Sequence, residues 1–243
     1  MKTTHPLLEL RNLTYSCPDQ KNSLLQNINF SIWKERIGFT GPNGSGKTTL
    51  FQIIMGLLQA DEGEILLHGT AIKTDKDLFT LRKKLGFLFQ NSDDQLFSPT
   101  VLEDVAFGPL NHGATTTEAR DISIQTLEKL GLKGFEDRIT HRLSGGEKKL
   151  VALATILSME PEMLLLDEPS NNLDPKTRER LIKILRNQHL PHIIISHDLD
   201  FLASTCTQLY TIQDLHLIRC KEKLIHSHEH IHPYGDQPHQ HGT

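Results

Sequence analysis

The stretch Phe39-Thr40-Gly41-Pro42-Asn43-Gly44-Ser45-Gly46-Lys47-Thr48-Thr49-Leu50 decides the fold of this chain of 243 residues. From Gly41 to Thr48 it reads G-x-x-x-x-G-K-[ST]. Apolar Ile37 and Phe39 precede the glycines as the end of a strand, and residues 49–58 follow with apolar side chains at helical spacing. This order of strand, glycine loop and helix is the context that a phosphate-binding loop requires.

The glycine loop has the chemistry of an anion site. Its backbone N–H groups can point inward, and the start of the following helix adds positive potential. We expect Lys47 to reach the β- and γ-phosphates of a nucleoside triphosphate and the Thr48 hydroxyl to bind Mg²⁺. The residues expected to hold the nucleotide here are Gly41, Pro42, Asn43, Gly44, Ser45, Gly46, Lys47, Thr48 and Thr49.

Composition narrows the class of protein. The formal net charge is −4 and 37% of residues are hydrophobic, with no basic stripe that would indicate a nucleic-acid partner. No apolar run approaches the roughly 20 residues that span a bilayer, and residues 1–6 lack a signal-peptide segment. The three cysteines are far apart, as expected of reduced thiols in a cytosol.

The first half of the chain predicts two subdomains beside the phosphate loop. Residues 7–15 and 28–33 alternate apolar and polar side chains, as an antiparallel sheet does. Residues 100–160 read as helical, with a capping box from Thr100 to Glu103, a stop at Pro109, and a second helix over 118–130. We therefore expect an α/β fold: a phosphate-loop core, an N-terminal antiparallel β subdomain, and a helical subdomain inserted at about 91–160.

The second half predicts the rest of the core. The apolar run at 163–166 and the strand at 192–196 suit buried parallel strands. Between them Pro175 suits the first turn of a helix to about Gln188, and residues 209–218 suit a closing hairpin. Shorter strands are expected at 65–68 and 85–89.

Polar residues follow three of these strands. Asp167 and Glu168 are costly at a buried strand end unless they bind Mg²⁺ and orient a hydrolytic water, which are the roles we expect for them. Gln90 is a candidate site residue or a solvated side chain. His197 could hydrogen-bond a γ-phosphate or could simply lie beside a helix start. Tyr15 could stack on a nucleotide base or be a surface aromatic.

The segment Leu143-Ser144-Gly145-Gly146-Glu147 predicts a second anion-binding helix start. Ser144 is a good N-cap, and Gly145 and Gly146 leave backbone N–H groups bare. Alone the signal is weak, because Ser-Gly-Gly is common in loops.

Taken in order, these motifs resemble the ATP-binding-cassette family over about residues 7–220. The resemblance implies that Tyr15 stacks on adenine, that Gln90 contacts Mg²⁺ with Thr48 and Asp167, and that His197 grips the γ-phosphate. It implies that Glu168, with His197 and Gln90, serves catalysis. It also implies a head-to-tail dimer with itself or a paralogue. In that dimer Ser144, Gly145 and Gly146 complete the partner's ATP site, and Asp174 lies at the seam.

The segment 89–109 is similar to the ATPases of energy-coupling-factor importers, the cobalt, nickel and vitamin group. That implies membrane transport subunits as partners and a peripheral place on the cytoplasmic face of the membrane. Three features depart from the pattern. Glu147 stands where Gln is usual, residues 33–36 replace a glycine turn, and the chain ends sooner than many relatives. A C-terminal dimerisation segment is therefore not expected.

Residues 1–222 are expected to form the nucleotide-binding domain and 223–243 a disordered tail. The tail carries the histidines His226, His228, His230, His232, His239 and His241. Alternating histidines can bind Ni²⁺, Co²⁺, Zn²⁺ or Cu²⁺, and the alternative is a solvated tail without a ligand. The sequence thus predicts an ATPase subunit of a nickel or cobalt importer. A vitamin importer ATPase and a soluble non-transport cassette protein are the alternatives.

Overall fold

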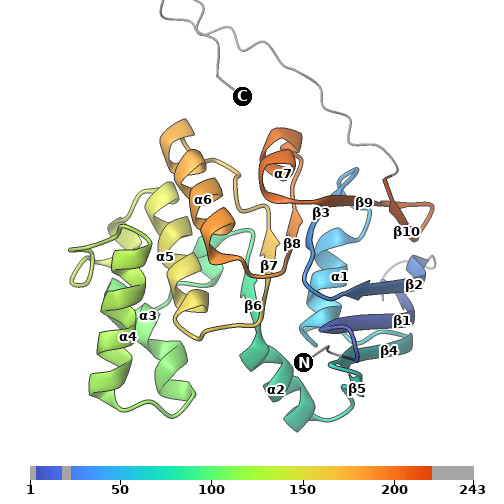
Figure 1. Cartoon of the computed structure of the whole chain (residues 1–243), viewed down its shortest axis with the longest axis horizontal. Coiled ribbons are helices and arrows are strands. Elements are labelled where there is room, and N and C mark those ends of the chain that lie inside the picture. The colour runs from blue at the N-terminus through green and yellow to red at the C-terminus, as the bar shows by residue number, and fades with distance from the viewer. Residues whose placement is uncertain (1–3, 18–22, 221–243) are drawn as a thin grey trace, which may run out of the picture.

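The computed structural model describes residues 4–17 and 23–220, which form two sheets and the helices packed around them (Figure 1). The strands are β1 (Leu8–Ser16), β2 (Ser23–Ile32), β3 (Arg36–Thr40), β4 (Glu62–Leu67), β5 (Thr70–Ala71), β6 (Leu85–Leu88), β7 (Met163–Asp167), β8 (His192–Ile195), β9 (Gln208–Gln213) and β10 (His216–Arg219). The helices are α1 (Lys47–Ile54), α2 (Asp75–Lys84), α3 (Val101–Asn111), α4 (Thr116–Lys129), α5 (Gly145–Leu157), α6 (Pro175–Gln188) and α7 (Leu199–Thr205).

The central sheet has the strand order β10-β9-β3-β8-β7-β6. Its strands from β9 to β6 pair in parallel, and β10 closes the sheet as an antiparallel hairpin with β9. The other sheet, β2-β1-β4-β5, is antiparallel throughout. The expected α/β core with an antiparallel β subdomain is therefore confirmed.

Strand β7 is buried on both faces, and its alternate residues belong to different cores. Met163 and Leu165 pack in the cluster with α1 and the antiparallel sheet. Leu164 and Leu166 pack in the cluster with α3 to α7. A continuous apolar run is the sequence of a parallel strand covered on both sides, and it leaves only the carboxyl end of the strand for polar chemistry.

The segment between β6 and β7 is helical, as predicted, and contains α3, α4 and α5 (green to yellow in Figure 1). All three begin with a capping box, including the one predicted from Thr100 to Glu103. The predicted stop at Pro109 is wrong, because α3 continues to Asn111. Proline cannot donate to the carbonyl of Val105, and the buried Ser158 hydroxyl donates to that carbonyl instead, at 2.9 Å.

Three strand or helix ends also differ from the prediction. Trp33 was expected to extend its strand, but β2 ends at Ile32. The helix after the glycine loop begins earlier and ends earlier than residues 49–58, because α1 spans Lys47–Ile54.

Among residues 4–17 and 23–220, every helix is too short or too polar to cross a bilayer.

His192 links the fold to pH. Its ring is 1% exposed and lies 3.0 Å from the Leu190 carbonyl and 3.1 Å from the Thr205 carbonyl. Burial lowers the pKa of His192 from 6.5 to about 4, although both carbonyls favour the charged ring. The unfolded chain therefore binds the proton first as the pH falls, and the stability contributed by neutral His192 is complete above 6.5 and lost toward 4.

We expect the free energy of unfolding to fall by up to about 3 kcal/mol between pH 7 and pH 4 because of this one ring. Urea unfolding at several pH values measures it. His192→Gln should flatten the profile over that range, whereas His141→Gln, at an exposed site, should leave it unchanged. A profile for His192→Gln that still parallels the wild type would contradict this assignment.

Candidate ATP site

The glycine loop connects β3 to α1, as predicted from the sequence. Gly46 precedes α1 with φ of 97° and ψ of 8°, a left-handed conformation that suits glycine. No side chain caps the helix, so the N–H groups of its first turn remain available to an anion. Residues 42–44 are exposed at the tip of the loop.

Lys47 lies inside this loop and is 5% exposed. Its Nζ donates to the carbonyls of Gly41 at 2.9 Å and Pro42 at 2.7 Å, and lies 3.3 Å from the Ser45 hydroxyl. Burial lowers the pKa of Lys47, and the nearby carboxylates of Glu168 and Asp167 oppose that shift. The amine is thus held where the loop would enclose phosphate oxygens.

Asp167 and Glu168 lie at the carboxyl end of β7, two strands from β3 in the sheet. They are 1% and 4% exposed, and burial raises the pKa of both carboxyl groups. The Glu168 N–H donates to the Ile195 carbonyl at 2.9 Å, and its Oε1 lies 3.3 Å from Nε2 of His197. His197, predicted near the γ-phosphate, therefore lies beside the predicted base.

Two carboxylate oxygens in this cluster have no hydrogen-bond partner: Oδ1 of Asp167 and Oε2 of Glu168. A hydrogen bond with the Thr48 side chain lowers the pKa of Asp167 against the effect of burial. Oxygen ligands from a carboxylate and a hydroxyl are what Mg²⁺ prefers, and buried oxygens without partners are costly. The residues present therefore fit a Mg²⁺ ion bound through Thr48 and Asp167.

Gln90 joins this cluster through a lysine that the sequence prediction missed. Lys149 on α5 is 5% exposed, and its Nζ donates to the Gln90 carbonyl at 2.7 Å. Burial lowers the pKa of Lys149 to about 8, against the attraction of Asp167 and Glu168. One signal was available: Lys149 occupies a helical stripe with Leu153 and Ile156, where an apolar residue is expected.

The second anion-binding helix start is present at α5. Ser144 caps the helix: its hydroxyl accepts from the Glu147 N–H at 3.3 Å and donates to the Glu147 carboxylate at 2.9 Å. Ser144 and Gly145 are exposed, and a side chain at Gly145 would meet open space. This exposed start lies on the helical subdomain.

Glu147 carries a charge at this helix start, and Arg138 is bound to it. Nη1 of Arg138 lies 3.0 Å from Oε1 of Glu147, and the guanidinium lies 3.6 Å over the Phe135 ring. Hydrogen bonds from the Ser144 backbone and side chain, followed by the charge of Arg138, lower the pKa of Glu147. The sequence prediction missed Arg138, because residues nine apart at a loop and a helix start give no periodic signal.

Asp174 caps α6 next to the α5 start. Its Oδ1 accepts from the Thr177 N–H at 3.0 Å, and its Oδ2 accepts from the Thr177 hydroxyl at 2.6 Å. A Cβ added to Gly146 would meet Thr177 at 3.3 Å, so the two helix starts are neighbours. Their roles at a subunit seam stay predictions.

Tyr15 lies less openly than a base-stacking ring would need in this structure. The sequence resemblance placed its ring on adenine, and here the side chain is 6% exposed and belongs to the core cluster with β2, β3 and α1. Its contact with adenine stays a prediction.

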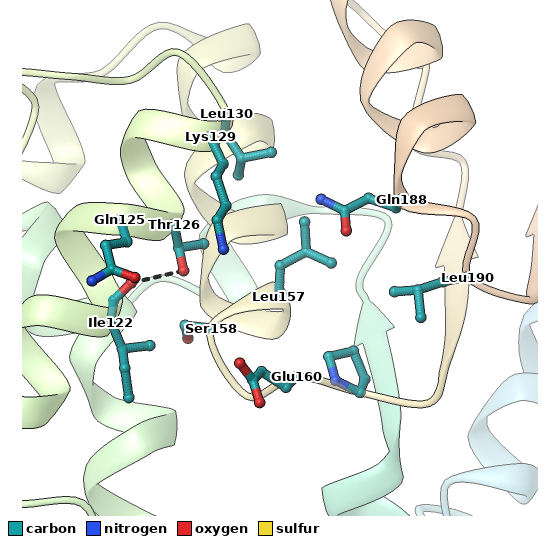
Figure 2. A pocket seen from close by; sticks show the side chains of 11 residues that line it. Ile122, Gln125, Thr126, Lys129, Leu130, Leu157, Ser158, Glu160, Gln188 and Leu190 are labelled. Carbon is teal, nitrogen blue, oxygen red and sulfur yellow. Dashed lines mark hydrogen bonds between the residues drawn. The ribbon is translucent and has the colours of Figure 1, made fainter.

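The cavity drawn in Figure 2 is separate from these residues. It has a volume of about 270 Å³ between α4 and the ends of α5 and α6, with Lys129 and Glu160 among its lining residues. None of the predicted nucleotide ligands lines it. Within the described segments 4–17 and 23–220, no cluster of three or more His, Cys, Asp or Glu side chains could hold a metal ion.

The fold and the site define an ATPase with a phosphate loop and an inserted helical subdomain. Residues 25–171 match the family described as ABC transporter, and the chain belongs to that family. It is an ATP-hydrolysing, ATP-binding subunit of a transporter.

Two relatives and two solved structures illustrate the likeness. A putative ABC transporter ATP-binding protein of Nitratidesulfovibrio vulgaris is 50% identical over 98% of this chain and 88% of its own length. The energy-coupling factor transporter ATP-binding protein EcfA of Methanothermobacter thermautotrophicus is 44% identical over 87% of this chain and 70% of its own.

The structure of cbiO1 from Clostridium perfringens, described as part of the ABC transporter complex cbiONQ, superposes with a TM-score of 0.78. Its sequence identity is 35%, over 88% of this chain and 87% of that one. The structure of a dimeric ATP-binding cassette in a post-hydrolysis state with ADP and Pi also superposes with a TM-score of 0.78. It is 27% identical in sequence, over 86% of this chain and 96% of that one. Membership of the importer group expected from residues 89–109 is consistent with these matches.

We expect Arg138→Ala to weaken ATP hydrolysis, by roughly three- to ten-fold, because it leaves the Glu147 charge uncompensated beside an incoming phosphate. Steady-state hydrolysis at low salt measures the effect. Glu147→Gln should restore the rate in the Arg138→Ala background, and Arg219→Ala on β10 is the control. If the double variant is as slow as Arg138→Ala alone, charge is not the reason.

Proposed function

We propose that this chain hydrolyses ATP to drive uptake of a transition metal ion, nickel or cobalt, through membrane subunits at the cytoplasmic face of the membrane. The observation that supports a metal ion as the substrate is the sequence of residues 226–241, where six histidines alternate with other residues. These residues lie outside the described part of the structure. The similarity of residues 89–109 to energy-coupling-factor ATPases supports an importer.

The charges of the site support hydrolysis at the γ-phosphate. Lys47 and the N–H groups of α1 neutralise the phosphates, and Glu168 offers an oxygen without a partner, Oε2, to the attacking water. Water adds to the γ-phosphorus, the bond to the bridging oxygen of ADP breaks, and the water proton passes to Glu168. Burial raises the pKa of Glu168, which makes it a better proton acceptor.

Mg²⁺, when bound by Thr48 and Asp167, would neutralise charge on the β- and γ-oxygens. The exposed start of α5 is suited to a phosphate that belongs to a second subunit. Closing a two-fold dimer would then sandwich two ATP molecules, each between the glycine loop of one subunit and Ser144 of the other. Hydrolysis and phosphate release remove the charge that holds this seam, so ATP shifts an equilibrium between closed and open dimers.

An apolar groove beside the Gln90 loop supports docking of a membrane subunit. The groove has a volume of about 440 Å³ and is lined by residues of α3, including Leu102, Phe107 and Leu110. Phe97 is 67% exposed and Phe107 48%, and their rings meet edge to face at 4.8 Å. Exposed aromatic pairs at a groove are typical of protein–protein contacts.

A vitamin importer ATPase is the second candidate. The relatives named energy-coupling factor transporter ATP-binding proteins support it, because that transporter group includes vitamin importers and the names specify no metal. In that case the histidine tail would have no part in transport.

The proposal predicts that cells lacking the protein accumulate less nickel or cobalt, and that Lys47→Ala fails to restore uptake. Zinc uptake measured in parallel should stay the same. Lys183→Ala, at an exposed lysine of α6, should restore uptake fully. If the uptake of none of the three metals changes although the purified protein hydrolyses ATP, the metal proposal fails. The vitamin importer then becomes the better-supported function.

A further inference from the structure

The loop that follows β6 is fastened along one side of α5. Nζ of Lys148 lies 2.6 Å from Oδ1 of Asp93. Lys149 donates to the carbonyl of Gln90, as described above, and lies 3.3 Å from that of Phe89. These ties connect the loop that carries Gln90 to the helix that begins at Ser144.

Gln95 strengthens the same connection from the loop side. Its Nε2 donates to the Ala152 carbonyl and the Thr155 hydroxyl, both at 2.9 Å, and its Oε1 accepts from the Phe89 N–H at 3.2 Å. The loop and α5 are thus joined by contacts along about two helical turns, from Lys148 to Thr155.

Lys149 is the buried member of this set. The ladder between β6 and β7 ends at the pair Leu88 and Leu166, so the carbonyls of Phe89 and Gln90 lie beyond the last strand pairing. Lys149 supplies the donor that the ladder no longer supplies. Its charge faces the cluster of Asp167 and Glu168, which stabilises it against burial.

A buried lysine is an expensive way to satisfy two carbonyls, because desolvation of the charge opposes folding. An apolar residue at this position of α5 would fit the stripe formed by its neighbours. The lysine does what an apolar residue cannot: it holds the backbone of Gln90 on one side and faces the carboxylates on the other. Lys149 thus contacts Gln90 directly and Asp167 through the attraction of their charges.

We propose that Lys149 is a positioning residue that holds Gln90 at a fixed place relative to Asp167 and makes the Gln90 loop and α5 move as one body. A displacement of Gln90 by nucleotide at the sheet edge would then displace the exposed start of α5 at Ser144. The inference rests on the proposed ATP sandwich, since Ser144 has a role only if it completes a second subunit's site.

The test is Lys149→Met in the full-length chain, which keeps the length of the side chain and removes its donors. We expect the melting temperature to fall, because the carbonyls of Phe89 and Gln90 lose their donor and the buried carboxylates lose a cation. We expect binding of ATP to a single chain to stay within about two-fold. We expect kcat to fall about ten-fold or more and the Mg²⁺ concentration for half-maximal hydrolysis to rise, because Gln90 is no longer fixed.

A second readout needs no hydrolysis. In a Glu168→Gln background, where we expect ATP to hold the dimer closed, Lys149→Met should raise the ATP concentration needed for dimerisation, measured by light scattering, about ten-fold. Lys148→Met is the matched control. Lys148 lies on the same helix as Lys149, and its replacement removes the ion pair with Asp93 of the loop while the Gln90 carbonyl stays bound to Lys149. This variant should change both readouts less than two-fold.

Action through Gln90 is tested by combination. If Lys149 acts by placing Gln90, Lys149→Met should add little to Gln90→Ala, and their effects on kcat should be far from additive. Lys149→Arg, which keeps a cation and donors, should retain part of the wild-type rate and replaces Lys149→Met if that variant does not fold.

Two results would overturn the inference. One is a wild-type kcat and Mg²⁺ dependence for Lys149→Met. The other is a loss of activity that is additive with Gln90→Ala when all variants are assayed well below their melting temperatures. All of these measurements use purified protein without membrane subunits, so they stand or fall apart from the metal-uptake experiment.

Discussion

The rest of the site depends on two buried carboxylates at the end of one strand, because their charge has to be balanced. Asp167 and Glu168 are almost fully buried, and each keeps one oxygen without a partner. Such a concentration of charge opposes folding unless cations lie close by. The chain provides two, Lys47 and Lys149, and both are 5% exposed. Lys47 comes from the glycine loop, which nucleotide would fill in the proposed reaction. Lys149 comes from α5, which the proposed reaction would move.

The two cations divide the site into halves. Lys47 comes from the glycine loop, where nucleotide phosphates would compete with the loop carbonyls for its amine. Lys149 comes from the helical subdomain and holds the Gln90 loop. Under our proposals, nucleotide and Mg²⁺ would alter the charge balance of the first half, and the second half would transmit the change to the apolar groove on α3 and to Ser144. The contacts of Lys149 and Lys148 with the loop after β6 are the route that we propose for this transmission.

Much of this arrangement follows from local sequence. The glycine loop, the apolar run that becomes β7, and the capping boxes at Thr100 and Ser144 each involve residues within a few positions of one another. A pattern of that range is readable without a structure. The carboxylates were predictable for the same reason, since they end an apolar run that must be buried.

What could not be predicted depends on partners far apart in the chain. Pro109 stays within α3 because Ser158, 53 residues from Val105, replaces the lost hydrogen bond. Tyr15 is buried because β1 lies between β2 and β4. Lys149 finds the Gln90 carbonyl 59 residues away. In each case tertiary contacts decide the outcome, and the propensities of the local sequence do not predict such contacts.

We propose that each active site needs the glycine loop of one chain and the Ser144 helix start of another. Mixing two inactive variants tests it most directly. Lys47→Ala disables the loop, and Ser144→Asp keeps an N-cap but places negative charge where phosphate is expected. In a mixed dimer one site combines the intact Lys47 of one chain with the intact Ser144 of the other. The account predicts that an equal mixture regains roughly a quarter of the wild-type hydrolysis rate, as a two-fold symmetric dimer requires. A mixture no faster than either variant alone would contradict it.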